Sequence, residues 1–155
     1  MGSIITLRNE IQALIDLMDN IEYLRASPGE ANIHIDKHKV NRCLAIHFDQ
    51  TTAIGTNFES SVVKIIPIEI LFVYKNHSLD EKLKDVDKLV DMSEDKADEF
   101  YDRLIQSSVI NDLGEPTDYT LERLEGYKRF DTILSGVLFN WDAPVSRTQY
   151  FCNGN

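Results

Sequence analysis

The last third of the chain reads Tyr127-Lys-Arg-Phe-Asp-Thr-Ile-Leu-Ser-Gly-Val-Leu-Phe-Asn-Trp141, followed by Asp142-Ala-Pro144. This run is the longest strand candidate in the C-terminal part of the chain, and we expect a strand from Arg129 to Trp141. It follows a predicted helix, Ser93 to Ser108, and therefore closes the domain. The tail Tyr150-Phe-Cys152 is expected to add a short strand or to lie along the sheet.

The strongest strand signal lies at Val62 to Tyr74. Apolar residues occupy both faces of this run, a pattern typical of a central or doubly covered strand. Pro67 interrupts it, and because proline cannot donate a ladder hydrogen bond, it predicts a bulge or an unpaired edge segment. Upstream, Ile33 and Ile35 alternate with polar residues, and residues 40 to 48 show the same period of two, which predicts half-buried strands.

Two main helices are predicted. Residues 6 to 25 carry apolar side chains at helical spacing, with Thr6 as N-cap, and this helix ends before Ser27-Pro28-Gly29. Residues 79 to 108 form the second helix, with a break near Met92 and with Ser93 as the N-cap of its later part. The intervening residues 49 to 60 are expected to form a loop.

Residues 111 to 126 are expected to form a turn-rich connector, which completes the order α-β-β-β-α-β. We therefore predict an α+β fold with a single, mostly antiparallel sheet of about four strands, covered mainly on one face by two main helices. Residues 1–155 are expected to form one domain, because a chain of 155 residues supports one sizeable core and not comfortably two.

The net charge of the chain limits the classes of partner that it can bind. The formal net charge is −10, and the one basic group, Lys37-His38-Lys39 with Arg42, is too small to reverse it. Phosphate binding needs clustered lysine and arginine, so sequence-specific nucleic-acid binding is not expected. The sequence shows neither a charged leader followed by an apolar core nor a run of 18 apolar residues, and we expect no membrane association.

The two cysteines, Cys43 and Cys152, do not form a disulfide framework, and reduced thiols are favoured over a bridge between them. Cys43 and His47 stand four residues apart, about 13 Å along a strand, which excludes direct contact within it. Both have the parity opposite to Leu44 and Ile46, so they are expected to mark the more polar face of the sheet. No nucleophile elbow, phosphate loop or cofactor motif is present, and no cofactor and no catalytic residue are expected.

Metal ligands are weakly suggested at His34, Asp36 and His38, which would share one face of a strand. Exposed polar residues explain this spacing more simply, and we expect no metal. The acidic run from Asp85 begins like a calcium loop but has Val90 and Lys96 where glycine and glutamate are needed, so a solvated helix face is expected there.

Aromatic residues gather near the C-terminus. Core and sheet-edge packing is the favoured explanation, and the alternative is a set of interface anchors, since tryptophan and tyrosine are enriched at interaction hot spots. The candidate interface residues are Phe58, Phe139, Trp141, Tyr150 and Phe151.

Two segments carry a resemblance to a known group of proteins. They are the helical stretch Asp98-Glu-Phe-Tyr-Asp-Arg-Leu104 and the later stretch Asp131…Leu134-Ser-Gly-Val137. With the order of elements around them, they resemble tailed-bacteriophage neck and tail-terminator proteins, and the resemblance covers most of the chain. It implies a virion structural protein without catalytic residues, assembled in the host cytoplasm.

The resemblance further implies a homo-oligomeric ring that closes tube growth and joins tail to head, with other phage tail or neck proteins as partners. Such assembly needs exposed strands or loops, and segments 49–60 and 111–126 are the candidates. An acidic ring lumen would let DNA pass without sticking. Two other classes stay open, a small intracellular binding or adaptor domain in the cytoplasm and an enzyme with a dispersed active site.

Overall fold

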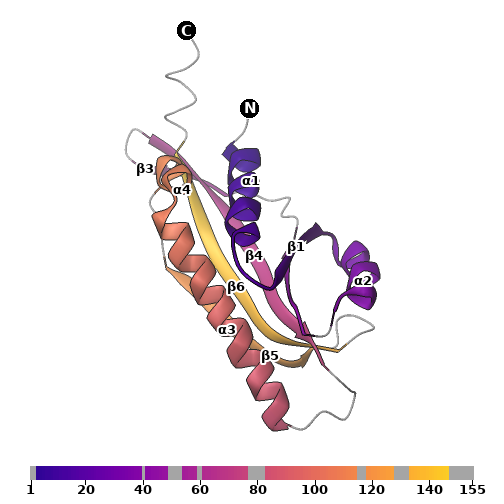
Figure 1. Cartoon of the computed structure of the whole chain (residues 1–155). Coiled ribbons are helices and arrows are strands. Elements are labelled where there is room, and N and C mark those ends of the chain that lie inside the picture. The colour runs from indigo at the N-terminus through magenta and orange to yellow at the C-terminus, as the bar shows by residue number, and fades with distance from the viewer. Residues whose placement is uncertain are drawn as a thin grey trace.

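The computed structural model describes residues 3–39, 41–48, 54–58, 61–76, 83–114, 118–127 and 133–146 (Figure 1). These residues form four helices and six strands. In chain order they are α1 Ser3–Asp16, β1 Ile21–Ala26, α2 Pro28–Lys37, β2 Cys43–Phe48, β3 Ile54–Phe58, β4 Ser61–Lys75, α3 Leu83–Gln106, α4 Ser108–Leu113, β5 Tyr119–Tyr127 and β6 Leu134–Ser146.

The strands form a single sheet in the order β1-β2-β4-β6-β5, and β3 pairs with the first part of β4. The β1–β2 pair is parallel and all other pairs are antiparallel. The expected α+β class and the mostly antiparallel sheet are thus confirmed. The expected strand number, helix number and order are wrong, because two helices (α2 and α4) and three strands (β1, β3 and β5) lie in segments that were assigned to other structures or to loops, β3 among them in the predicted loop 49–60.

The ladder between β4 and β6 is the spine of the sheet. Its register runs without interruption from Val63 opposite Ser146 to Lys75 opposite Leu134. The strand predicted at 62 to 74 is confirmed. The late strand needs correction, since β6 begins at Leu134 and continues past Trp141 through Asp142-Ala-Pro144.

Pro67 lies opposite Asp142 in this ladder. On the other side of β4, β3 pairs with Ser61–Ile65 and β2 pairs with Ile70–Val73. Among the described residues no strand pairs with the stretch between them. Within the described strands, the stretch around Pro67 is therefore unpaired on the side of β2 and β3 and paired with β6 on the other, so the predicted unpaired edge is observed on one side only.

The helix predicted for residues 6 to 25 is too long. Helix α1 ends at Asp16, and a turn brings Asn20 to a left-handed backbone conformation with φ of 54°. Asparagine tolerates this conformation better than most residues. The chain then pairs with β2 as strand β1, which buries Ile21 and Ala26. Tertiary pairing overrides a helical pattern of apolar residues here.

The strand predicted around Ile33 and Ile35 is helix α2. The carboxylate of Glu30 accepts hydrogen bonds from the backbone N–H and the Oγ of Ser27, at 3.0 and 2.9 Å, and Pro28 occupies the first turn. This arrangement is typical of a helix start. Ile35 is buried while Ile33 is 66% exposed, as expected for neighbouring positions on a surface helix.

Helix α3 is continuous, so the predicted break at Met92 and the N-cap role of Ser93 are wrong. Ser93 is buried in the middle of the helix, where its Oγ donates to the carbonyl of Leu89 at 2.8 Å. Ser107 is the observed N-cap and accepts from the N–H of Ile110 at 3.2 Å, at the start of α4. The connector predicted for residues 111 to 126 contains the end of α4 and most of β5.

Of the described helices, three cover one face of the sheet and one covers the other. Helices α1, α3 and α4 pack on one face, where they enclose the larger core around Phe72, Phe100 and Phe139. Helix α2 packs on the opposite face over β1 and β2, and encloses a smaller core with Ile35 and Leu44. None of the described helices is long and apolar enough to cross a membrane.

Candidate functional site

Strand β5 forms one end of the sheet. It pairs with β6 along one edge, and no described strand pairs with its other edge. Two contacts hold it against α3. The hydroxyl of Tyr119 donates to Asp98 at 2.7 Å, and the guanidinium of Arg123 donates to Asp91 at 2.8 Å. The edge is therefore a rigid, preformed row of backbone donors and acceptors.

The contact with Asp98 changes the acidity of Tyr119. Because its hydroxyl donates to a carboxylate, and because the site is partly desolvated, the pKa of Tyr119 rises from 10.0 to about 12. Its ring also stacks against Tyr101 at 4.2 Å between centroids. Tyr119 is thus a neutral, positioned anchor between β5 and α3.

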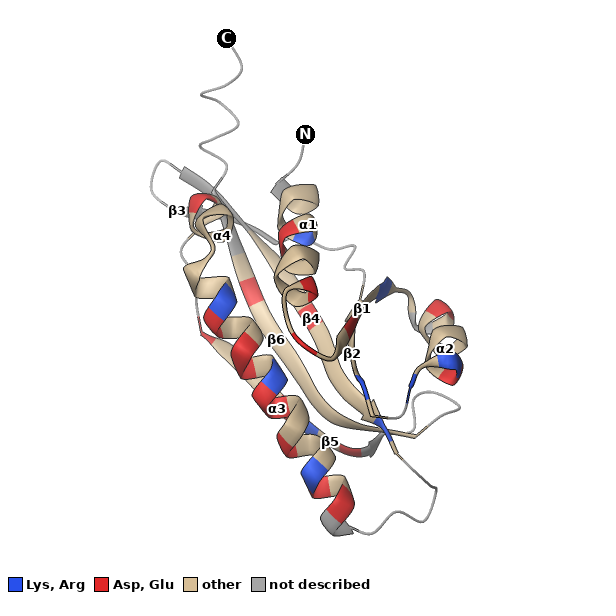
Figure 2. Ribbon diagram, in the orientation of Figure 1, with Lys and Arg blue, Asp and Glu red and all other residues tan. Residues whose placement is uncertain are grey.

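The outer face of α3 carries a row of exposed residues at helical spacing of four, three, four and three. This row, the acidic stripe, consists of Asp91, Asp95, Asp98, Asp102 and Ile105. Helix α3 as a whole has eight carboxylates and four cationic side chains. The acidic stripe lies beside β5, because Asp98 and Asp91 bind Tyr119 and Arg123 of that strand. Figure 2 shows the acidic residues of α3 in red and its basic residues in blue.

Four cationic side chains lie around the C-terminal end of α2, beside the carboxylates of Asp36 and Glu22, and Arg42 is 3.7 Å from the latter. This basic corner consists of Lys37, Lys39, Arg42 and Lys75. The Nζ of Lys75 donates to the carbonyl of His38 at 3.3 Å, and Arg42 donates to the carbonyl of Ile21 at 2.9 Å. Lys37 and Lys39 are exposed.

The weak metal candidates lie on α2 and at its C-cap instead of on a strand. In a helix, His34 and His38 lie on one side and Asp36 points elsewhere, since residues two apart do not share a face. Both histidines face Glu22, with His38 Nδ1 at 3.0 Å and His34 Nε2 at 3.8 Å from its carboxylate.

The ring of His38 is fully engaged, because its Nε2 lies 2.7 Å from the carbonyl oxygen of Arg42. It links α2, β1 and the start of β2. Within the described ranges, no group of three or more histidine, cysteine, aspartate or glutamate side chains is arranged to hold a metal ion.

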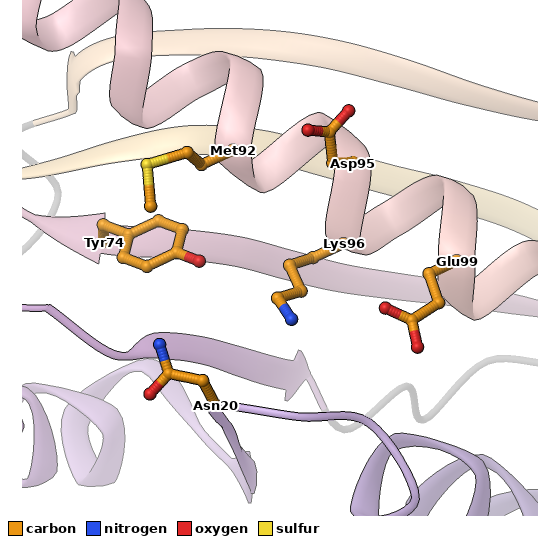
Figure 3. A pocket seen from close by; sticks show the side chains of 6 residues that line it. All are labelled: Asn20, Tyr74, Met92, Asp95, Lys96 and Glu99. Atoms are coloured by element: carbon orange, nitrogen blue, oxygen red, sulfur yellow. The ribbon is translucent and has the colours of Figure 1, made fainter.

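A shallow pocket of about 330 Å³ lies between α3 and the turn after α1 (Figure 3). Its lining residues are Asn20, Tyr74, Met92, Asp95, Lys96 and Glu99. Lys96 reaches across it, and its Nζ donates to the carbonyl of Asp19 at 2.6 Å. The lysine therefore ties α3 to the turn instead of standing ready as a base.

Two buried groups lie behind this pocket, and neither is activated. Burial raises the pKa of the Cys43 thiol to about 12. Burial and the neighbouring Cys43 raise the pKa of the Tyr74 hydroxyl. Both groups are neutral near pH 7, whereas a nucleophile or base needs a pKa close to the working pH.

The prediction that Cys43 and His47 mark a polar sheet face is wrong. All residues of β2 are buried, and Cys43 and Ala45 belong to the larger core. The expected separation of Cys43 and His47 within one strand is observed, and the Nδ1 of His47 lies 2.7 Å from the hydroxyl of Tyr23.

The candidate interface aromatics have different locations. Phe139 is fully buried and packs against Tyr119 and Phe100, at 5.2 and 5.3 Å between ring centroids, and Trp141 is 2% exposed. These two side chains belong to the core of the subunit. Phe58 ends β3, and Tyr150 and Phe151 lie outside the described residues.

The chain matches no family model, no curated protein and no solved structure. Function therefore has to be inferred from the surfaces of the chain itself. The sequence prediction missed β5 as a strand, although Tyr119 and Leu121 alternate with Thr120 and Glu122 in the period of two that a strand requires.

Proposed function

We propose that the chain is a virion structural protein of a tailed bacteriophage. In this role it assembles as a homo-oligomeric ring at the head–tail junction or at the tail end, as a neck or tail-terminator subunit does. The observation that carries the proposal is the edge of β5 with which no described strand pairs, since most of this nine-residue strand lies within the segment that the sequence singled out for assembly. Such an edge is a template for pairing with another chain.

The two segments that resemble the phage proteins also support the proposal, because they pack against the same part of the core. Phe100, in the helical segment, contacts Phe139 of β6 at 5.3 Å between ring centroids. Gly136, in the strand segment, lies so close to Ser93 of α3 that an added Cβ would be 2.9 Å from its Oγ. The resemblance thus concerns one structural unit, the α3–β6 contact.

The chemistry of the described residues favours a structural role. The groups with raised pKa values, Cys43, Tyr74 and Tyr119, are held neutral and serve packing or hydrogen bonding. A net charge of −10 would let a ring of such subunits surround DNA without binding its phosphates.

An alternative is a small intracellular binding domain. It is favoured by the half of the sheet face that α2 leaves open, where Glu69, Asn140 and Asp142 are at least partly exposed. A polar sheet face of this kind suits a protein ligand as well as a ring lumen. The two functions differ in the state of the isolated protein.

Size-exclusion chromatography with multi-angle light scattering tests the proposal. The purified chain at micromolar concentration is expected to elute as one defined oligomer, and negative-stain images are expected to show rings. A stable monomer across that concentration range would rule out the ring and leave the binding domain.

A further inference from the structure

The two charged surfaces lie on opposite faces of the sheet. Helix α2, which ends in the basic corner, packs over β1 and β2 on the face with the smaller core, and α3, which carries the acidic stripe, packs on the face with the larger core. The two surfaces therefore point to different sides of one subunit.

Each charged surface also contains an exposed isoleucine. Ile33 is 66% exposed and precedes Lys37 by four residues, so both lie on the outer face of α2. Ile105 is 42% exposed and follows Asp102 by three residues in the acidic stripe. An apolar centre with charges around it is the usual anatomy of a protein interface.

The symmetry of an assembly limits which of these surfaces can contact each other. A two-fold contact uses the same patch on both copies, and because the stripe and the corner lie on opposite faces of the sheet they do not belong to one patch. A two-fold contact would therefore place each surface against its own copy, and two acidic stripes or two basic corners would repel. A head-to-tail contact places opposite charges together and leaves one surface of each kind free for the next copy. Contacts of this type close into a ring when the rotation allows.

We propose that the acidic stripe of one copy docks on the basic corner of a second copy, and that this contact repeats around the assembly. The proposal rests on the ring function above and names the surface through which the ring forms. Ile33 and Ile105 supply the apolar contact, and Lys37 and Lys39 face Asp95 and Asp102.

Salt dependence alone does not test this contact. Added salt weakens the local attraction between the two surfaces, but it also weakens the repulsion between subunits that each carry a net charge of −10. Exchange of charge between the two surfaces is the sharper experiment, because it predicts a specific rescue.

The experiment uses two charge-reversed proteins. In the first, Lys37→Glu and Lys39→Glu bring the four positive charges of the basic corner to a net charge of zero and place glutamates opposite Asp95 and Asp102 of the next copy. In the second, Asp95→Lys and Asp102→Lys bring the four negative charges of the acidic stripe to zero and place lysines opposite Lys37 and Lys39. Each protein alone is expected to assemble at least tenfold more weakly than the unchanged chain, which is about 1.4 kcal/mol at the contact.

Mixed in equal amounts, the two proteins are expected to assemble again, since the lysines at 95 and 102 of one protein then face the glutamates at 37 and 39 of the other, and the unchanged surfaces face each other at the next contact. Asp16→Lys, an exposed reversal on α1 outside both surfaces, is the control and should leave assembly unchanged. Circular dichroism and thermal unfolding of each variant establish that it folds.

The outcomes separate the two proposals. If the unchanged chain is monomeric, the ring function fails and this contact fails with it. If the chain forms rings, but the reversals leave assembly unchanged or the mixture is no better than either variant, then the ring stands and the head-to-tail contact is wrong. An Ile33→Ser variant that weakens assembly while keeping the fold would support the apolar centre, and one that assembles normally would exclude it.

Discussion

The substitution Gly136→Ala tests the packing of the sheet at its spine. Gly136 pairs with Val73 in the β4–β6 ladder, directly beneath α3. An added Cβ would overlap the backbone oxygen of Phe72 and would lie 2.8 Å from the Cα of Val73 and 2.9 Å from the Oγ of Ser93. The first two atoms are backbone of a central strand, which cannot move aside cheaply.

The cost can be worked from this geometry. Ordinary contact between a methyl group and the Phe72 oxygen requires β4 and β6 to separate locally by about 1 Å or more. That shift breaks one or two ladder hydrogen bonds at about 1 kcal/mol each, and overpacking adds about 1–3 kcal/mol. We expect a loss of about 3–5 kcal/mol, a large part of the roughly 5–15 kcal/mol that holds a domain folded.

The assay is urea unfolding followed by circular dichroism and by the fluorescence of Trp141, the single tryptophan of the chain. Protein concentration is held fixed, because assembly contributes to apparent stability. Gly29→Ala is the matched control, since an added Cβ there meets nothing within 4 Å. It should be neutral or slightly stabilising.

Two results would refute this reasoning. One is a Gly136→Ala protein within about 0.5 kcal/mol of the unchanged chain, the range of an ordinary surface substitution. The other is full rescue of Gly136→Ala by Ser93→Ala. Rescue would mean that the helix side chain, and not the backbone of β4, is the obstacle.

Three further predictions use single side chains. Tyr119→Phe should lose about 0.5–1.5 kcal/mol at neutral pH, and unfolding measured at each pH should show a smaller fall in its stability between pH 10 and 12 than in the unchanged chain, to which Cys43 and Tyr74 also contribute. His38→Gln should lose about 1–3 kcal/mol because the buried ring joins two elements, while His34→Gln, at an exposed position, should change little. In a Cys152→Ser protein, Cys43 should resist Ellman's reagent until the chain unfolds, because its pKa is about 12.

The direction of the pH effect predicted for Tyr119→Phe follows from the linkage between protonation and folding. A phenol whose pKa is raised from 10.0 to about 12 by folding stabilises the native state fully below pH 10, and that contribution is lost as pH rises toward 12. Equal pH profiles for the two proteins would contradict it. The histidine prediction fails if both glutamine variants are equally stable, and the thiol prediction fails if Cys43 reacts at the same rate in native and unfolded protein.

The elements that were predicted correctly are mainly those whose hydrophobic pattern in the sequence matches their burial in the fold. Val62 to Tyr74 is apolar on both faces and became the central strand β4, and residues 94 to 106 carry a strong helical stripe and became most of α3. Cys43–Phe48 became strand β2 as predicted, but it is buried on both faces and not on one. In the first two segments local propensity and tertiary burial agree.

The elements that were not predicted are those whose secondary structure depends on tertiary pairing or on turn residues. Ile21–Ala26 fits the helical spacing of the preceding residues, and only the left-handed turn at Asn20 and pairing with β2 make it a strand. Ser27 and Glu30 signalled a helix start, but the alternation of Ile33 and Ile35 suggested a strand. Strand β5, Tyr119–Tyr127, carries charged residues, which are common on edge strands. In the sequence, these charges made the segment resemble a connecting loop.

The candidate surfaces were only partly visible before the fold was known. Segment 111–126 was marked as a candidate for assembly and as a loop, and in the structure it contains the end of α4 and most of the edge strand β5. The acidic stripe and the basic corner could not be recognised as surfaces on opposite faces of one sheet, because the packing of α3 and α2 places them there and the chain order does not.

Native mass spectrometry of the purified chain tests the central claim most directly. The structure leads us to expect one dominant species whose mass is a whole multiple of 17.8 kDa, with the same number of subunits across the micromolar range, as a closed ring requires. A dominant 17.8 kDa monomer over that range would contradict the claim that this chain is a ring-forming virion subunit.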